Sequence, residues 1–202
     1  MNAIIVSALL GVVMMFSGIL FKNNKPALTN IAAIGLVILL LANLSNTYGV
    51  YVIHVNTHNL FNFEKMGMFF NSIAITSTLL YVLLSGKAVE NVGVDTAEYY
   101  ALIFFVLCGI SILSSFNGLL MLFLGIEIMS IPLYILTGAD KRNLKSNEAS
   151  LKYFLMGSFS TGILLMGITL IYGATGSFTL GVSNVQSAGG LIPKTSFIER
   201  GG

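Results

Sequence analysis

Six stretches of mostly apolar residues alternate with short polar segments along this chain. Within each stretch the apolar residues follow one another without the two-residue alternation that marks the strands of a membrane barrel. A helix needs about 20 apolar residues to cross the hydrocarbon core, and a bilayer accepts only helices or closed barrels. The pattern therefore predicts six transmembrane helices, at residues 3–21, 27–44, 66–84, 99–116, 118–137 and 151–172.

The composition supports an all-α fold, a polytopic transmembrane helical bundle. Charged residues make up only 9% of the 202 residues, whereas hydrophobic residues make up 55% and the mean hydropathy is +0.88. An average soluble domain has about 25% charged residues, and so few charges cannot cover a surface that faces water. We therefore exclude a soluble enzyme, a nucleic-acid-binding protein and a disordered chain, and we expect the lipid bilayer as a partner.

The basic residues predict the orientation of the bundle. No basic residue precedes the first apolar stretch, which argues against a cleavable signal peptide. Basic residues are enriched in the cytoplasmic loops of membrane proteins, and here six lie on the side opposite the N-terminus against three on the N-terminal side. The N-terminus is therefore expected to be extracytoplasmic. The six are Lys22, Lys25, Lys87, Lys141, Arg142 and Lys145, and the three are Lys65, Lys194 and Arg200.

One acidic residue, Glu127, interrupts the middle of the fifth apolar stretch. With about ten residues on either side it lies roughly 15 Å from each end of a helix, too deep for a short side chain to reach water. An ionised carboxylate at that depth costs several kcal/mol unless it faces a partner or water. The carboxyl group is therefore either protonated or accompanied by a buried base or a water chain. Both states suit a proton-handling site, while the plainer alternative is a neutral acid that only bonds between helices.

A proline follows this acid closely. Pro132 lacks an N–H group, so the carbonyl of Ile128 loses its helical partner. In lipid such a carbonyl needs another donor, often water or a hydroxyl such as that of Ser130. We therefore predict a helix kink at Pro132 that favours local hydration beside Glu127. The alternative is that Pro132 only shapes packing.

A lysine near the start of the sixth stretch is the second candidate charge. The helix is expected to begin as early as Ser146, an acceptable N-cap, with Glu148 in its first turn. Lys152 would then lie more than one turn inside the helix. Lysines near helix ends also extend readily to the membrane surface, so Lys152 is either functional or one more topology signal.

The residues around these charges resemble a known family. Glu98-Tyr-Tyr-Ala-Leu, the stretch around Glu127 and Pro132, the segment from Lys141 through Lys152, and Tyr172-Gly-Ala-Thr-Gly-Ser resemble the antiporter-like membrane subunits of respiratory complex I. The later segments are most similar to subunit N of the bacterial NADH-quinone oxidoreductase. Multisubunit cation/proton antiporters and membrane-bound hydrogenases share the glutamate but fit the other segments less well.

This resemblance implies a function and site residues. It implies a proton-translocating subunit in the bacterial inner membrane, which works with other membrane-arm subunits while NADH and quinone react elsewhere in the complex. Glu127 would be the acid of the fifth helix, and Lys152 would be the lysine near the start of the sixth. We expect no cofactor bound by this chain. His54 and His58 lack a third ligand, so we expect no metal site either.

The resemblance also implies that the chain is incomplete. Family members have about fourteen helices in two inverted repeats, an arrangement found in other transporters, whereas this sequence resembles them only through six. We predict a transmembrane domain at residues 1–178 and a polar, glycine-rich tail without family resemblance at residues 179–202. A frameshift, a truncated gene or an incomplete assembly would each explain the difference. Two other functions remain open: a subunit of a cation/proton antiporter, and a non-pumping structural membrane fragment.

Overall fold

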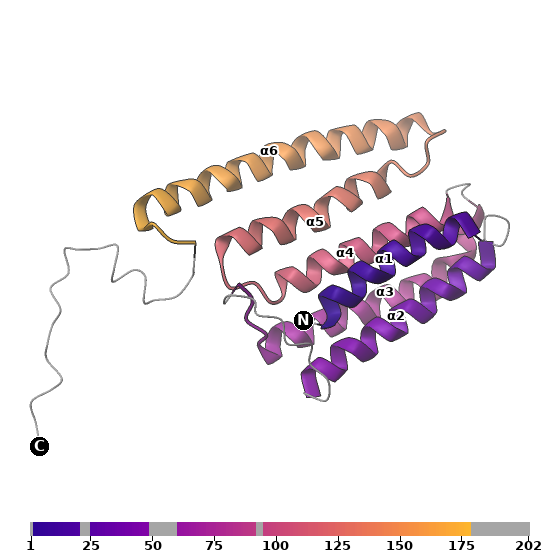
Figure 1. Cartoon of the computed structure of the whole chain (residues 1–202). Coiled ribbons are helices and arrows are strands. Elements are labelled where there is room, and N and C mark those ends of the chain that lie inside the picture. Colours follow the sequence, from indigo (N-terminus) through magenta and orange to yellow (C-terminus); the bar gives the residue numbers. More distant parts are fainter. Residues whose placement is uncertain (1, 21–24, 49–59, 92–94, 179–202) are drawn as a thin grey trace, which may run out of the picture.

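The computed structural model describes residues 2–20, 25–48, 60–91 and 95–178. Within these ranges it contains six long helices and no sheet, as the apolar pattern predicts (Figure 1). All six are long and apolar enough to span a membrane. His54, His58 and the expected tail lie outside the described residues. The helices are α1 (Asn2–Leu20), α2 (Lys25–Tyr48), α3 (Lys65–Asn91), α4 (Thr96–Leu113), α5 (Leu119–Thr137) and α6 (Leu144–Thr175).

Several helices extend beyond the apolar windows that predict them. Helix α3 continues to Asn91 and α6 begins at Leu144, each seven residues outside the predicted span. Hydropathy detects only the part of a helix that lies in lipid, whereas backbone hydrogen bonding continues into the polar ends. Helix α4 instead ends three residues earlier than predicted, because Ser114 and Ser115 form a turn and Phe116 pairs with Phe61 in an isolated β-bridge.

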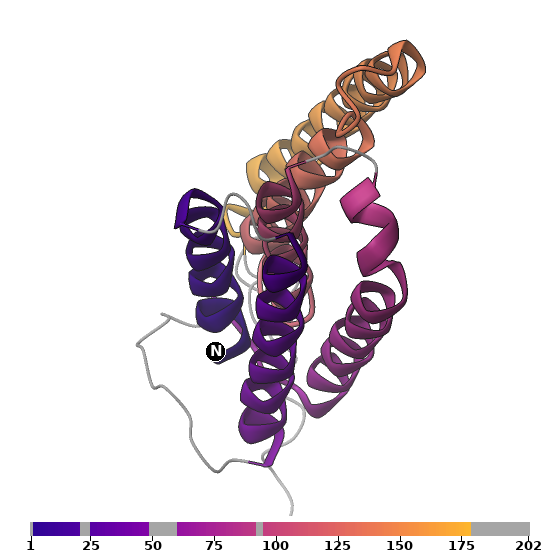
Figure 2. The same cartoon turned by 90° about the vertical axis from the view of Figure 1, so that its right-hand side faces the viewer.

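Helix α4 lies at the centre of the bundle. It contacts α1, α2, α3 and α5, and more than half of its span is buried. Large side chains of α4, including Tyr100, Phe104 and Leu107, pack with Leu36 and Leu39 of α2 in the main core. The antiparallel pair α5 and α6 lies beside this four-helix group, with α5 against α4 and α6 outermost (Figures 1 and 2).

The outer surface of the bundle is strongly apolar. Leucine, isoleucine, methionine and phenylalanine side chains are exposed along α1, α2, α3, α5 and α6. Helix α6 is the most exposed helix, with Ile168 as its buried residue. In water such a surface would drive association, whereas in a bilayer it contacts acyl chains. The fold thus has the surface of a membrane protein.

Candidate functional site

Glu127 lies in the middle of a membrane-spanning helix, as predicted. It is the ninth residue of α5, so it lies about 12 Å along the axis from Leu119 and about 15 Å from Thr137. Its side chain is partly buried, and it makes no ion pair with any described residue. The carboxyl group is therefore held at mid-depth without a fixed counter-charge in this part of the chain.

The helical period shows which neighbour Glu127 faces. Tyr134 lies seven residues later, two turns on, and shares this face of α5. The ring of Tyr134 packs edge-on against Tyr153 of α6, with ring centroids 4.9 Å apart, and its hydroxyl lies against Gly157. Glu127 is therefore on the side of α5 that faces α6.

The register between the two helices places Glu127 opposite a hydroxyl-bearing residue of α6. Gly138 of the loop after α5 lies against Ser150, whose hydroxyl donates to the carbonyl of Tyr134 at 3.1 Å. Following this antiparallel register down α6 brings the level of Glu127 to about Thr161. The next residue, Gly162, is exposed, and an added side chain there would meet nothing within 4 Å, so it faces away from α5. Thr161 lies one turn after Gly157 on the same face of α6 and is partly buried, so a hydroxyl-bearing residue lies at the level of Glu127.

Pro132 lies within the fifth helix without ending it. Helix α5 continues from Leu119 to Thr137, and Pro132 is buried. Ser130 donates its hydroxyl to the carbonyl of Ile126 at 2.6 Å, so it does not satisfy the carbonyl of Ile128, as the sequence suggested it could. The carbonyl that Pro132 deprives of a helical donor thus lies next to Glu127 in the chain, and the kink itself stays a prediction.

Helix α6 begins earlier than the sequence indicated, and the expected N-cap at Ser146 is wrong. Asn143 is the N-cap, and its side chain accepts a hydrogen bond from the backbone N–H of Lys145 at 3.0 Å. The hydroxyl of Ser146 instead donates to the carbonyl of Thr137 at 2.8 Å and ties α6 to the end of α5. Asparagine is an equally good cap, and the apolar Leu144 extends the helix. Lys152 consequently lies two turns inside α6.

The structure does not bring Lys152 and Glu127 together. Lys152 forms a salt bridge with Glu148, one turn earlier on α6, and the two side chains are 70% and 63% exposed. Residues that contact α5, such as Ser150 and Gly157, lie on the opposite face of α6. Lys152 is also about 13 Å along the axis from the level of Glu127. The two candidate charges therefore occupy different faces and depths, and their roles stay predictions.

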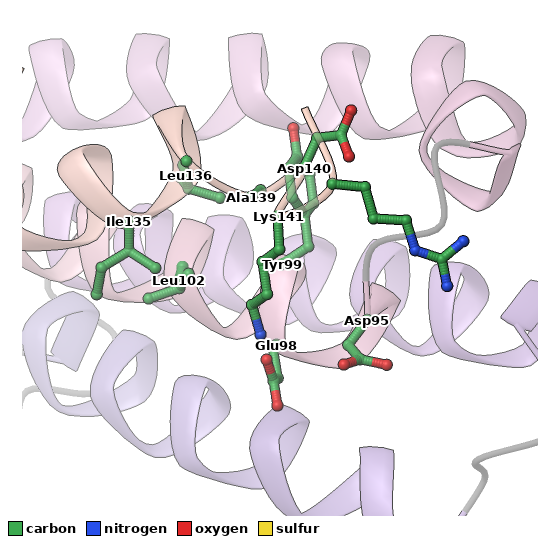
Figure 3. A pocket seen from close by; sticks show the side chains of 11 residues that line it. Asp95, Glu98, Tyr99, Leu102, Ile135, Leu136, Ala139, Asp140 and Lys141 are labelled. Carbon is green, nitrogen blue, oxygen red and sulfur yellow. The ribbon is translucent and has the colours of Figure 1, made fainter. Parts of the chain in front are cut away.

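A second group of charges lies where α4 begins and α5 ends. A cavity of about 280 Å³ lies between the first turns of α4 and the loop after α5. Figure 3 shows the side chain of Lys141 extending from that loop toward Glu98, with the carboxylate of Asp95 nearby on the same side. The motif residues Glu98 and Lys141, far apart in the sequence, thus meet at one end of the bundle. Its charged lining is Asp95, Glu98, Asp140, Lys141 and Arg142.

A buried polar network joins α2, α3 and α4 near the other end of the bundle, and the sequence reasoning missed it. Asn43 donates to the hydroxyl of Ser72 at 2.7 Å and to the carbonyl of Met68 at 3.1 Å. Asn71 donates to Asn43 at 3.0 Å and accepts from Ser111 at 3.1 Å. Asn43, Asn71 and Ser111 are each at most 2% exposed. The sequence did contain an indication of this network, because Asn43 and Asn71 interrupt the second and third apolar stretches.

Replacing Asn71 by alanine is expected to destabilise the bundle by about 1–2 kcal/mol. The substitution leaves the amide oxygen of Asn43 and the hydroxyl of Ser111 without their shared partner in a dry interior. Thermal unfolding of the purified protein in detergent measures the effect. The control is Thr76→Ala, because Thr76 is exposed and bonds only to its own helix. Equal unfolding temperatures for both variants would show that the network does not stabilise the fold.

Family models, curated proteins and solved structures that are similar to this chain all point to the same family. The family model described as NADH:quinone oxidoreductase/Mrp antiporter, TM matches residues 116–197, which include α5 and α6. This range continues past the domain boundary that we predict at residue 178, and that boundary stays a prediction. The match thus covers both candidate charges.

Curated relatives and a solved structure agree with this match. The chain is 41% identical over 182 residues to NADH-quinone oxidoreductase subunit N of Flavobacterium psychrophilum and 42% identical over 180 residues to that of Cytophaga hutchinsonii. These alignments cover 89% and 88% of this chain and 38% of each relative. A chain of respiratory complex I from Thermus thermophilus with bound aureothin superposes with a TM-score of 0.71 at 28% identity. That superposition covers 89% of this chain and 38% of the other.

Proposed function

We infer the function of this chain from its family: it belongs to the antiporter-like membrane subunits of NADH-quinone oxidoreductase and matches the N-terminal part of subunit N. It is a multi-pass bacterial membrane protein. The chain spans 38% of the length of the relatives named above. The activity and partners of a whole subunit are accordingly proposals for this chain.

We propose that the chain acts in proton translocation as part of the membrane arm of NADH-quinone oxidoreductase. Other subunits would carry the electrons from NADH to quinone, and this chain would bind neither cofactor. The observation that carries the proposal is the carboxyl group of Glu127, which is partly buried at mid-depth of α5 without an ionic partner among the described residues. A charged residue at that depth is costly and is a functional candidate by default.

The chemistry proposed for Glu127 is the binding and release of one proton. Its carboxylate oxygen takes up a proton when the surroundings disfavour charge and releases it when a cation approaches. The hydroxyl of Thr161, at the level of Glu127 on the α5-facing side of α6, is a polar group that can hydrogen-bond the water that carries that proton. The freed carbonyl of Ile128 offers a further acceptor for such water. The opposing cation would come from the part of the relatives that this chain does not span.

The test of this function is NADH-driven proton translocation in membrane vesicles that contain the assembled complex. With the predicted orientation, the loop that contains Lys141 faces the cytoplasm, and NADH oxidation would move protons away from that side. Proton exchange that requires sodium and proceeds without NADH would instead favour the cation/proton antiporter. A fragment with only a structural role would change assembly but not the ratio of protons moved to NADH oxidised.

Replacing Lys152 by methionine is expected to lower NADH-driven proton translocation at least about fivefold, the lower end of typical coupling between sites. The reason is that Lys152 faces away from α5 and is placed to receive a charge from another part of the subunit or complex. The exposed pair with Glu148 contributes at most about 1 kcal/mol, so folding and assembly should persist. The control is Lys145→Met, an exposed lysine in the first turn of the same helix. Equal pumping by both variants would leave Lys152 as a topology signal only.

A further inference from the structure

Two adjoining cavities at one end of the bundle have the chemistry of a phospholipid site. The cavity that Lys141 and Glu98 line shares Tyr99 and Leu136 with a groove of about 400 Å³ between α3, α4 and α5. Five of the eleven residues that line the first cavity are charged, whereas the second cavity is lined mainly by apolar residues. Tyr99 stands at their junction, where its hydroxyl is 2.6 Å from that of Tyr81. A polar pocket thus continues directly into an apolar groove.

The groove is open on the outer surface of the described helices. Ser77 is exposed and Tyr81 is 42% exposed, so α3 leaves the groove open to its surroundings. Its floor is formed by Ile103, Val106 and Leu107 of α4, and its other wall by Leu133 and Leu136 of α5. An acyl chain entering from the bilayer would lie parallel to the helices, against the apolar side chains of α4 and α5, with the hydroxyl-bearing residues of α3 along its other side.

The charges of the polar pocket are mixed, and this selects the headgroup. Lys141 and Arg142 supply two cations, whereas Asp95, Glu98 and Asp140 supply three carboxylates. A purely anionic headgroup would be attracted by the cations but repelled by the acids. A headgroup with both a phosphate and an ammonium satisfies both sets, and basic residues between helices at a membrane surface are known to hold lipid phosphates.

The acids and the cations of the pocket come from two different elements. Asp95 and Glu98 both lie at the start of α4, whereas Lys141 lies in the loop after α5 (Figure 3). Arg142 follows Lys141 in the same loop. The loop is held in place, because Asn147 of α6 donates to the carbonyl of Lys141 at 3.2 Å. In Figure 3 the carboxylate of Asp140 points away from Glu98 and Asp95, so two acids remain on the α4 side.

We propose that these two cavities bind one phospholipid with a primary ammonium headgroup, of the phosphatidylethanolamine class. Its phosphate lies against Lys141 and Arg142, its ammonium donates hydrogen bonds to Asp95 and Glu98, and one acyl chain occupies the groove. A carboxylate accepts hydrogen bonds from a primary ammonium. A quaternary ammonium has no N–H to donate and is recognised instead by aromatic cages, which a single tyrosine does not form.

The experiment is lipid retention by the purified protein. The chain is extracted from vesicles with equal amounts of phosphatidylethanolamine, phosphatidylcholine and phosphatidylglycerol, and the lipid that remains bound is identified by native mass spectrometry. We expect one phosphatidylethanolamine molecule to be retained in preference to the other two lipids. The soluble headgroup glycerophosphoethanolamine should not displace it, because the groove contributes to binding.

Two sets of variants test the two halves of the headgroup separately. Lys141→Ala with Arg142→Ala should reduce retention about tenfold, the equivalent of losing a charge-assisted hydrogen bond. Asp95→Asn with Glu98→Gln should instead remove the preference over phosphatidylcholine and raise retention of phosphatidylglycerol. The control is Lys145→Ala, an exposed lysine nearby that does not line the cavity. Helical circular dichroism checks the fold of each variant.

The proposal would be overturned by equal retention of the three lipids by the unaltered chain. It would also be overturned if either set of cavity variants retained the lipids as Lys145→Ala does. Since the four altered side chains are exposed, loss of folding is not expected in either set. If one set nevertheless failed to fold, the selectivity change in the other set would still decide the matter.

Discussion

Replacing Glu127 by glutamine is expected to reduce NADH-driven proton translocation by about tenfold or more, while the complex remains assembled. Glutamine has nearly the same shape as glutamate but cannot release a proton, and a proton-transferring group typically contributes about 10²- to 10⁴-fold to rate. Because Glu127 makes no ion pair with the described residues, its loss breaks no salt bridge there. Acidification of vesicles on addition of NADH measures translocation, and native electrophoresis measures assembly.

Two further variants make the outcome at Glu127 decisive. Glu64→Gln, in an exposed segment before α3, removes the same charge outside the membrane and should pump normally. Glu127→Asp retains a carboxyl group about one methylene shorter and should recover part of the activity. If Glu127→Gln pumps as well as Glu64→Gln, then Glu127 is a protonated packing contact, and the structural alternative for the chain is favoured.

The sequence was sufficient to predict the six helices because hydrophobicity along the chain reports directly on the bilayer. It was less informative about the ends of the helices. The polar first turns of α6 are invisible to hydropathy, and Asn143 and Ser146 are equally plausible caps until the contact of Ser146 with Thr137 is known. Contacts between helices depend on tertiary packing. The central position of α4 in the bundle could therefore not be predicted from the sequence.

The depth of the candidate residue Glu127 was predictable, but the geometry around the candidate residues was not. The depth of Glu127 follows from counting residues on either side. The orientation of Lys152 depends on which face of α6 packs against α5, and that face is set by Tyr134 packing against Gly157. The network around Asn71 was missed because a neutral amide hardly lowers the hydropathy of a span. Asn71 matters because it bonds to residues of two other helices, and the sequence around Asn71 does not indicate which residues those are.

Replacing Gly109 by alanine is expected to destabilise the bundle by about 1–3 kcal/mol and to impair pumping as well. A Cβ atom at Gly109 of α4 would lie 2.6 Å from the backbone nitrogen of Met129 and 2.8 Å from its Cα atom. These atoms belong to the backbone of α5 and cannot move without the helix. Helix α5 must therefore shift away from α4, and Glu127, two residues before Met129, shifts with it.

The matched control is Gly162→Ala in the exposed helix α6. A Cβ atom there would meet nothing within 4 Å, so the substitution adds only the helix preference of alanine over glycine, about 0.5–1 kcal/mol. Unfolding in detergent should thus occur at lower temperature for Gly109→Ala and at an equal or higher temperature for Gly162→Ala. Because both variants make the same chemical change, any difference between them arises from helix contact. If the two variants unfolded alike and pumped alike, the close approach of α4 and α5 would not be what fixes the position of Glu127 in the membrane.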